Sequence, residues 1–349
     1  MIATSFLLPL LLAAQAGQVQ VQHDGHAYNP HWSPDGKWLA FEVNQYGDAV
    51  DLYVVKIVSG NAGVPQKVVI PGLSSSFSSR GSVVAGPVWH PQGHVVFEGS
   101  NSGGTQRLYY WTPGGQAAAE LLTQAQVKGD LTWPTLSADG MRLAFVSDAS
   151  GNGDLYLWSQ QDNQVQPTFS SPLAEAAPRF SPDRTMLAFT RKNKGSEDLF
   201  LWHGPGSEPT MLRGGNGDQT RPIWAGENIL YFTNERGELH WDIAITDKAG
   251  TSRRILARDV RLSMRAGPAL TPDGRAVAYT MSDPERADRI MITTLDGAKT
   301  VEIPTGLVAC GEPDLVEVGG RVFLAFTALP NAASDFRQLH ILEVTGRLP

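Results

Sequence analysis

Short apolar runs recur along the chain, and polar segments separate them. There are seven such runs: Leu39-Ala40-Phe41, Val95-Val96-Phe97, Leu143-Ala144-Phe145, Leu187-Ala188-Phe189, Leu230-Tyr231-Phe232, Val277-Ala278-Tyr279 and Leu324-Ala325-Phe326. Runs of three are too short for a buried helix, and most place a small residue between two large ones, as strands stacked between sheets do. The pattern predicts an all-β chain.

Each apolar run belongs to a longer unit that begins with an X-Pro pair. The pairs are Asn29-Pro30, Gly86-Pro87, Trp133-Pro134, Ala177-Pro178, Arg221-Pro222, Gly267-Pro268 and Glu312-Pro313, with steps of 57, 47, 44, 44, 46 and 45 residues between prolines. A turn such as Ser33-Pro34-Asp35-Gly36 follows most pairs, and a second strand such as Asp51-Leu52-Tyr53 follows the apolar run. A unit of about 45 residues with four short strands predicts one blade of a β-propeller.

The ends of the repeat array predict a closed ring. The seventh unit stops near Val344 after its third strand, and the alternating segment 18–22 precedes the first unit without belonging to it. If that segment is the outer strand of the last blade, two exposed sheet edges disappear. We therefore predict a seven-bladed β-propeller, closed by the N-terminal strand, as a single domain over residues 17–349. An open solenoid is the alternative way to stack the units.

The first residues are predicted to be an export signal. An apolar run over 6–12 is followed by Ala14-Gln15-Ala16, a small-x-small cleavage pattern, although no Lys or Arg precedes Lys37. The alternative is an uncleaved anchor, but about ten apolar residues are too few to cross a bilayer. A signal peptide over 1–16 predicts a periplasmic or secreted protein that does not span the membrane.

The repeats resemble a known family. The pattern Pro-x-x-Ser-Pro-Asp-Gly-x-x-Leu-Ala-Phe…Asp-Leu-Tyr is met almost fully at 30–53 and 178–200. It is similar to the PD40 (WD40-like) propeller repeats of TolB-like periplasmic proteins. The resemblance implies a non-enzymatic envelope protein whose partner is another envelope protein or a peptidoglycan-associated lipoprotein. TolB-like proteins carry an α/β domain before a six-bladed propeller, and we expect that domain to be absent here. Similar blades also occur in prolyl-oligopeptidase-like enzymes.

Charge and composition narrow the partners. Lys and Arg number 28 against 35 Asp and Glu, a formal charge of −7 without a basic run, which argues against nucleic acid. The single Cys310 cannot form an internal disulfide, and Gly99-Ser100-Asn101-Ser102-Gly103 lacks the central Ser of a hydrolase elbow. We therefore expect a monomer that is not an enzyme and holds no cofactor.

One loop carries a candidate calcium site. In Asp148-Ala149-Ser150-Gly151-Asn152-Gly153-Asp154, oxygen ligands stand at alternate positions and Gly at the sixth, as in calcium loops. The candidate ligands are Asp148, Ser150, Asn152 and Asp154. The twelfth position is Ser159, where such loops need Glu, so a polar hairpin loop is the alternative interpretation.

The candidate partner site lies beside the X-Pro pairs. In a propeller, these connections and the loops between second and third strands meet on one face, around the channel mouth. The predicted site residues are His31, Trp133, Arg179, Arg221, Arg265, Glu312 and Asp314, joined by Phe77 and Arg80 of the Ser-rich insertion 72–82. Arg and Trp are common interface anchors. We predict protein or peptide binding at the mouth. The alternatives are solvated loop ends, a channel site for a small molecule or carbohydrate, including lyase-type chemistry, and a spacer without a partner.

Overall fold

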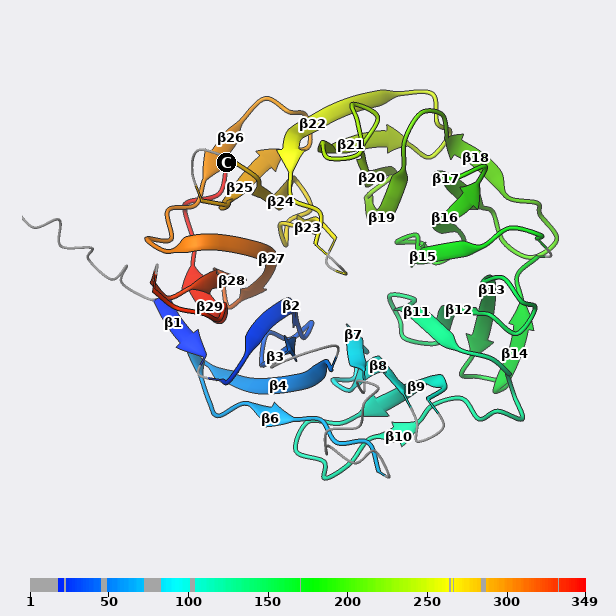
Figure 1. Ribbon diagram of the computed structural model, residues 1–349, viewed down its shortest axis with the longest axis horizontal. Coiled ribbons are helices and arrows are strands. Elements are labelled where there is room, and N and C mark those ends of the chain that lie inside the picture. The colour runs from blue at the N-terminus through cyan, green and yellow to red at the C-terminus, as the bar shows by residue number, and fades with distance from the viewer. Residues whose placement is uncertain are drawn as a thin grey trace, which may run out of the picture.

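The described residues form an all-β structure. The computed structural model describes residues 18–21, 23–44, 49–71, 83–100, 104–169, 171–263, 265, 267–283, 287–331 and 333–349, and these residues contain strands and no helix. The sheets are arranged around a common centre, and each points one edge toward it (Figure 1). The chain passes around this centre once, from blue at the N-terminal end to red at the C-terminal end.

The described strands form six sheets, and the first three of these follow one another in sequence. The bounds are β2 (His26–Trp32), β3 (Trp38–Asn44), β4 (Asp51–Val58), β5 (Asn61–Ala62) and β6 (Gln66–Lys67); β7 (Val84–Trp89), β8 (Val95–Ser100), β9 (Gln106–Trp111) and β10 (Ala119–Glu120); β11 (Leu131–Leu136), β12 (Arg142–Ser147), β13 (Asp154–Ser159) and β14 (Gln164–Pro167). In each sheet the first strand lies nearest the centre (Figure 1).

The remaining three sheets complete the circuit. The bounds are β15 (Glu175–Phe180), β16 (Leu187–Asn193), β17 (Ser196–Trp202) and β18 (Thr210–Arg213); β19 (Gln219–Ala225), β20 (Asn228–Thr233), β21 (Trp241–Asp247), β22 (Arg253–Val260), β23 (Ala269–Leu270), β24 (Ala276–Met281), β25 (Arg289–Thr294) and β26 (Thr300–Glu302); β1 (Gln18–Val21), β27 (Val308–Val318), β28 (Arg321–Leu329) and β29 (Gln338–Glu343). The eight-stranded sheet contains two repeat units, joined by the single residue pair Val260 and Met281.

The apolar triplets form the core between neighbouring sheets. In the first unit, Leu39 and Phe41 pack in one cluster with Phe323 of β28, while Ala40 packs in another with Phe97 of β8. Residues of a strand alternate between its two faces, so one triplet contacts both neighbouring sheets. The small middle residue allows the sheets to approach closely, as the sequence indicated.

The predicted Ser-Pro-Asp-Gly turns are confirmed. Ser33 Oγ donates to Asp35 Oδ1 at 2.7 Å, and the Gly36 amide donates to the Ser33 carbonyl at 2.9 Å. Gly36 has a φ of +64°, and a Cβ there would meet Val318 at 2.2 Å, so both conformation and space require glycine. The same hydroxyl–carboxylate bond recurs in three later units, at Ser137, Ser181 and Thr271.

The N-terminal strand lies against the last sheet. β1 pairs antiparallel with β29 in a register that matches Gln18 with Leu342 and Val21 with Leu339. Val21 is buried in the cluster that also contains Leu339 and Ile341. Blue β1 and red β29 accordingly lie side by side in Figure 1.

Candidate functional site

Six of the seven X-Pro pairs lie inside the first strands rather than at their ends, whereas Gly267-Pro268 directly precedes β23. In six units the pairing register shifts across the pair, so each first strand contains a bulge there, for example between Ala176 and Arg179. The residue before Pro has a left-handed φ of +49° to +64° in these units: Asn29, Gly86, Trp133, Ala177, Arg221 and Glu312. The expectation that the pairs form connections at the mouth is therefore corrected. A bulge tolerates Pro because it removes the residue from the hydrogen-bonded ladder, where Pro could not donate.

Buried side chains from neighbouring units hold these bulges. Glu42 Oε1 accepts the amide of Gly86 at 2.8 Å, and Glu98 Oε1 accepts the amide of Trp133 at 2.8 Å. The amide of Glu312 donates to Thr280 Oγ1 at 3.0 Å. Glu42, Glu98 and Thr280 each directly follow the apolar triplet of their own unit. The residue after one triplet thus satisfies the left-handed amide of the next unit.

Hydrogen bonds from the last unit and from its own unit hold the bulge at Asn29. The amide of Asn29 donates to Glu312 Oε2 at 2.8 Å, and its side-chain amide donates to Glu42 Oε1 at 2.8 Å. Burial raises the pKa of Glu42, Glu98 and Glu312, while their hydrogen bonds oppose that rise. These buried carboxylates therefore link consecutive units around the centre.

Arg265 reaches across the centre. It lies between β22 and β23, and its Nη1 forms an ion pair with Glu98 Oε2 of β8 at 3.0 Å. These segments lie on opposite sides of the centre in Figure 1. The Glu98 side chain is 3% exposed and the Arg265 side chain 30%. Burial lowers the pKa of Arg265, but the charges of Glu98 and Glu42 outweigh it, and the result is a raised pKa.

The residues after Pro form a second set of polar groups. His31 and Arg179 occupy the same repeat position, directly after Pro30 and Pro178, and both are half-buried. An indole of the next unit fixes the backbone of each: Trp89 Nε1 donates to the His31 carbonyl at 2.8 Å and Trp224 Nε1 to the Arg179 carbonyl at 3.1 Å. Two equivalent bonds therefore fix the backbone at these two positions.

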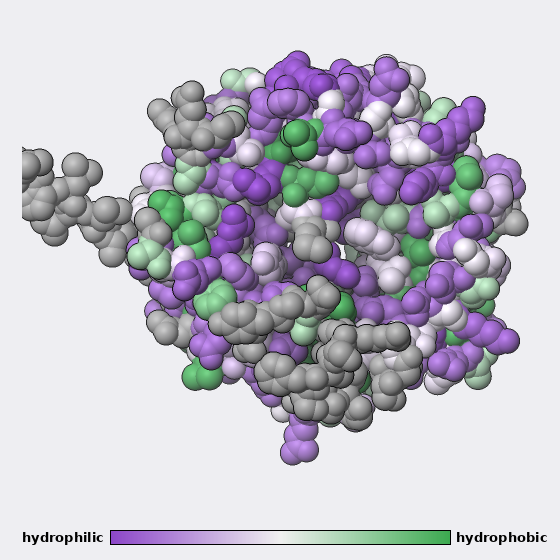
Figure 2. Space-filling view, viewed as in Figure 1, coloured by the Kyte–Doolittle hydropathy of each residue, from purple (hydrophilic) through white to green (hydrophobic). Residues whose placement is uncertain are grey.

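Charges from distant units act on one another at this site. Burial, and then the charge of Arg179, lower the pKa of His31 to about 4. Burial lowers the pKa of Arg179 to about 10. Burial also lowers the pKa of Arg221 to about 10; the acids Glu197 and Glu312 oppose this fall, and Arg179 and Arg265 add to it. The charged groups of different repeats thus converge on the centre, where Figure 2 shows hydrophilic residues on the displayed face.

Asp314 carries the third polar group after a Pro. Its Oδ2 accepts the Trp32 amide at 2.7 Å, and burial raises its pKa to about 6. The structure thus brings together His31, Arg179, Arg221, Arg265 and Glu312, while Asp314 contacts the backbone directly after His31 and Trp133 contributes its amide to the Glu98 contact. Phe77 and Arg80 lie outside the described residues.

A pH titration tests the environment of Asp314. Because its pKa is raised from 3.8 to about 6, the fold favours the protonated form, and this stabilisation is lost as pH rises from about 4 to about 6. Relative to Asp314→Asn, we expect the wild-type free energy of unfolding to fall by about 1–2 kcal/mol over that window. Urea denaturation at a series of pH values measures it, and parallel curves for both proteins would contradict the raised pKa.

The candidate calcium loop directs its side chains to the neighbouring backbone. Asp148 Oδ1 accepts the amide of Asp130 at 2.7 Å, and Asn152 Nδ2 donates to the Pro172 carbonyl at 3.1 Å. Ser150 is exposed, whereas Asp154 is buried at the start of β13. Within the part of the chain that the structure describes, no three His, Cys, Asp or Glu side chains gather in a metal-binding group.

Sequence reasoning missed the carboxylates that link the units. Glu42 and Glu98 were not singled out, because in the sequence each looks like an ordinary polar residue after an apolar run. The available signal was their register: the position after the triplet is Glu in two units and Thr in four, namely Thr190, Thr233, Thr280 and Thr327. A polar side chain recurring beside a buried run indicates a buried hydrogen-bond partner.

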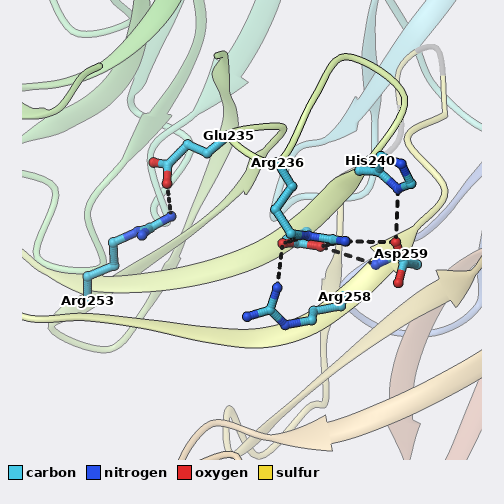
Figure 3. Close-up of polar contacts among 7 residues, drawn as sticks. Glu235, Arg236, His240, Arg253, Arg258 and Asp259 are labelled. Atoms are coloured by element: carbon cyan, nitrogen blue, oxygen red, sulfur yellow. Dashed lines mark hydrogen bonds and ion pairs between the residues drawn. The ribbon is translucent and has the colours of Figure 1, made fainter. Parts of the chain in front are cut away.

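A separate polar cluster lies at the fifth unit, where the loop between β20 and β21 meets the end of β22 (Figure 3). Arg236 lies between two carboxylates, with Nε 2.8 Å from Asp242 Oδ2 and Nη2 2.7 Å from Asp259 Oδ1. His240 Nδ1 lies 3.3 Å from Asp259 Oδ1. A pocket of about 370 Å³ adjoins this cluster, and Leu239 beside it is 91% exposed. These ion pairs are internal and hold the loop against β22.

Comparisons with known proteins establish the class. No protein-family model matches the sequence, and no curated protein matches it. TolB from Acinetobacter baumannii has a TM-score of 0.57 and 18% identity, over 77% of this chain and 64% of that one. An oligogalacturonate lyase in complex with manganese has a TM-score of 0.62 and 13% identity, over 94% and 90% of the two chains. The propeller domain of the Trilobed protease from Pyrococcus furiosus, with an open velcro topology, has a TM-score of 0.57 and 12% identity, over 92% and 96%.

The chain is a β-propeller with TolB-like and other propeller proteins as structural neighbours. Identities this low show the fold alone, and the neighbours include a TolB, a lyase and a protease domain, so the shared fold does not decide the activity. Among the described residues, no helix has the length and apolar character needed to cross a bilayer. The assignment to the PD40 repeats stays a prediction.

Proposed function

We propose that this chain is an exported, non-enzymatic, seven-bladed propeller that binds an envelope protein or lipoprotein at the mouth of its channel. Residues 1–16 would be the signal peptide and 17–349 one domain. The count of seven treats the eight-stranded sheet as two blades, since one residue pair alone joins β22 to β24. The pairing of β1 with β29 supports closure of the ring by its N-terminal strand. Export would place the protein in the periplasm or outside the cell.

The convergence of charged side chains from different repeats at the centre carries this proposal. Arg179 and Arg221 come from consecutive units, and the acids Glu312 and Asp314 come from the last one. Such a polarised set suits a partner with complementary charges, because charge pairs set orientation and specificity at an interface. The carboxylates Glu42, Glu98 and Glu312 accept backbone amides of neighbouring units, which is a structural task.

Capture of a partner tests this function. We expect the wild-type protein to retain a specific envelope component after crosslinking in envelope extracts, and Arg179→Ala with Arg221→Ala to lose it while the melting temperature changes little. Removing one anchor residue of an interface lowers the affinity several-fold to a hundredfold, and the double variant removes two. Mass spectrometry of the captured material is the measurement. Arg142→Ala with Arg184→Ala, at the turns of the third and fourth units, is the matched control and should capture normally. Equal capture by both double variants would place the interface elsewhere.

A channel site for a small molecule or carbohydrate is the second candidate. Asp314 favours it, because a carboxyl with a pKa of about 6 is suited to proton transfer. The oligogalacturonate lyase is one of the structural neighbours. Incubation with oligogalacturonate, followed by ultraviolet absorbance of unsaturated products, distinguishes this candidate: product formation lost in Asp314→Asn would replace the binding function with an enzymatic one.

A further inference from the structure

Among the residues that the structure describes, Arg179 has no acidic partner. Its hydrogen bond among the described residues runs from Nη1 to the carbonyl of Pro178 at 2.9 Å, and the ion pairs of the described residues do not include it. A guanidinium has five N–H donors, so most of its donors are unused by that bond. Arg179 is half-buried, and a charge that is partly withdrawn from water is normally paired, because leaving it unpaired there is costly. An unpaired arginine at the centre of a ring therefore indicates an anionic ligand.

The backbone around Arg179 is rigidly held. The indole of Trp224 bonds the Arg179 carbonyl from the next unit, and Ala177 beside it has a left-handed φ of +49° at the bulge. The repeat position equals that of His31, which Trp89 holds in the same way. A side chain on such a support keeps its position when a ligand arrives, which favours recognition.

Other cations reinforce the field around Arg179. Its charge contributes to the lowered pKa of His31 in the first unit and of Arg221 in the fifth, so the three groups lie within electrostatic reach of one another. Glu312 and Glu197 act on Arg221, and Arg265 is engaged by Glu98. No acid contributes in this way to the pKa of Arg179, whose shift comes from burial. Of the three arginines at this site, Arg179 is therefore the one whose pKa no acid raises.

The surrounding acids select the class of anion. Glu42, Glu98 and Glu312 lie near the same centre, and they would repel a doubly charged phosphate more strongly than a singly charged carboxylate. A planar carboxylate also matches the two parallel N–H groups of a guanidinium.

We propose that Arg179, with Arg221 beside it, binds the C-terminal carboxylate of the partner protein. This inference rests on the proposed function. The central position favours a chain end over an acidic side chain, since an extended terminus can enter the ring where the surface of a folded partner cannot. His31 and Arg265 then flank the bound terminus as positioning residues.

Matched peptides test the proposal on the full-length exported protein. The probes are acetate, tri-alanine with a free C-terminus, tri-alanine amide and digalacturonate. We expect tri-alanine to bind more tightly than acetate, and the amide to bind at least roughly tenfold more weakly than the free acid, because it lacks the charge that Arg179 recognises. The His31 ring, followed by NMR, provides an independent readout: a bound carboxylate offsets the charge of Arg179 and should raise the His31 pKa by roughly 0.5–1 unit.

Variants separate this site from a general charge effect. Arg179→Gln should weaken tri-alanine binding roughly 10- to 100-fold and abolish the His31 shift, whereas Arg184→Gln, an exposed arginine of the same unit that pairs with Asp139, should change binding less than about twofold. Equal binding of acid and amide, no binding of either, or unchanged binding by Arg179→Gln would each overturn the proposal. Tighter binding of digalacturonate would overturn the peptide assignment in favour of a sugar acid.

Different outcomes contradict the binding function and the recognition of a terminal carboxylate. If extracts yield a partner whose capture needs Arg179 and Arg221, yet amidation of the C-terminus has no effect on tri-alanine, the terminal carboxylate is wrong and the binding function stands. If capture is independent of both arginines, the proposed function itself is wrong.

Discussion

A chain that begins at His23, without β1, is expected to unfold with a melting temperature about 4–7 °C below that of the chain from residue 17. The deletion removes the buried Val21 and the backbone bonds of a four-residue register with β29. Burial of one Val contributes about 1.5–3 kcal/mol and each hydrogen bond about 1 kcal/mol, for a loss of roughly 3–5 kcal/mol. For a domain of about 330 residues this corresponds to the stated shift. Calorimetry measures it.

The same deletion exposes the edge of β29. An unpaired edge strand pairs readily with other chains, so we expect the shortened protein to aggregate at concentrations where the longer one stays monomeric in light scattering. Gln20→Thr is the control, because it alters an exposed side chain and keeps the backbone register with His340, and its stability should change by less than about 0.5 kcal/mol. An unchanged melting temperature after deletion would show that β1 does not close the ring.

Replacing Glu98 with Ala is expected to destabilise the fold by about 3–5 kcal/mol. The change leaves the guanidinium of Arg265 without its ion-pair partner and the amide of Trp133 without its acceptor. Breaking a buried pair by removing one member costs that much because the other charge stays in a poorly solvated place. Urea denaturation of both proteins is the measurement.

A double-mutant cycle isolates the contact between Glu98 and Arg265. We expect Glu98→Ala with Arg265→Ala to cost less than the two single changes added together, with a coupling of about 1–3 kcal/mol. Glu343→Ala is the comparison, since it removes a surface pair with Arg321 and should cost no more than about 1 kcal/mol. Additive effects of the two single changes would mean that the ion pair contributes nothing of its own.

The sequence predicted what depends on one unit alone. The Ser33–Gly36 turn, the alternating triplet at Leu39 and the short strands follow from local conformational preferences and from side-chain periodicity, which each unit expresses by itself. The β-propeller class followed from the repetition of these features. The pairing of the segment from Gln18 with β29 was also predicted. A strand that belongs to no repeat unit can pair with the last unit, whose outer edge is otherwise unpaired.

Contacts between units could not be predicted in the same way. The bulge at Ala177 requires a left-handed residue that X-Pro pairs alone do not reveal, because Pro fits a strand end as well as a bulge. The bond from Gly86 to Glu42 joins residues of two units, and Arg265 meets Glu98 over 167 residues. Such pairings depend on how the units are arranged in space, which periodicity does not encode. Arg179 and His31 were singled out in the sequence as polar residues beside Pro, whereas their support by Trp224 and Trp89 became visible only in the folded chain.

The crossing of the centre by Arg265 constrains a residue in a distant repeat. A Cβ on Gly86 would lie 3.1 Å from Glu98 Oε1 and 3.2 Å from Arg265 Nη1, whereas other units carry Asn, Trp or Glu at the same position. The two sites should therefore covary during evolution: descendants of this gene that shorten residue 265 are free to acquire a larger side chain at 86, and those that keep the arginine should favour a small residue there.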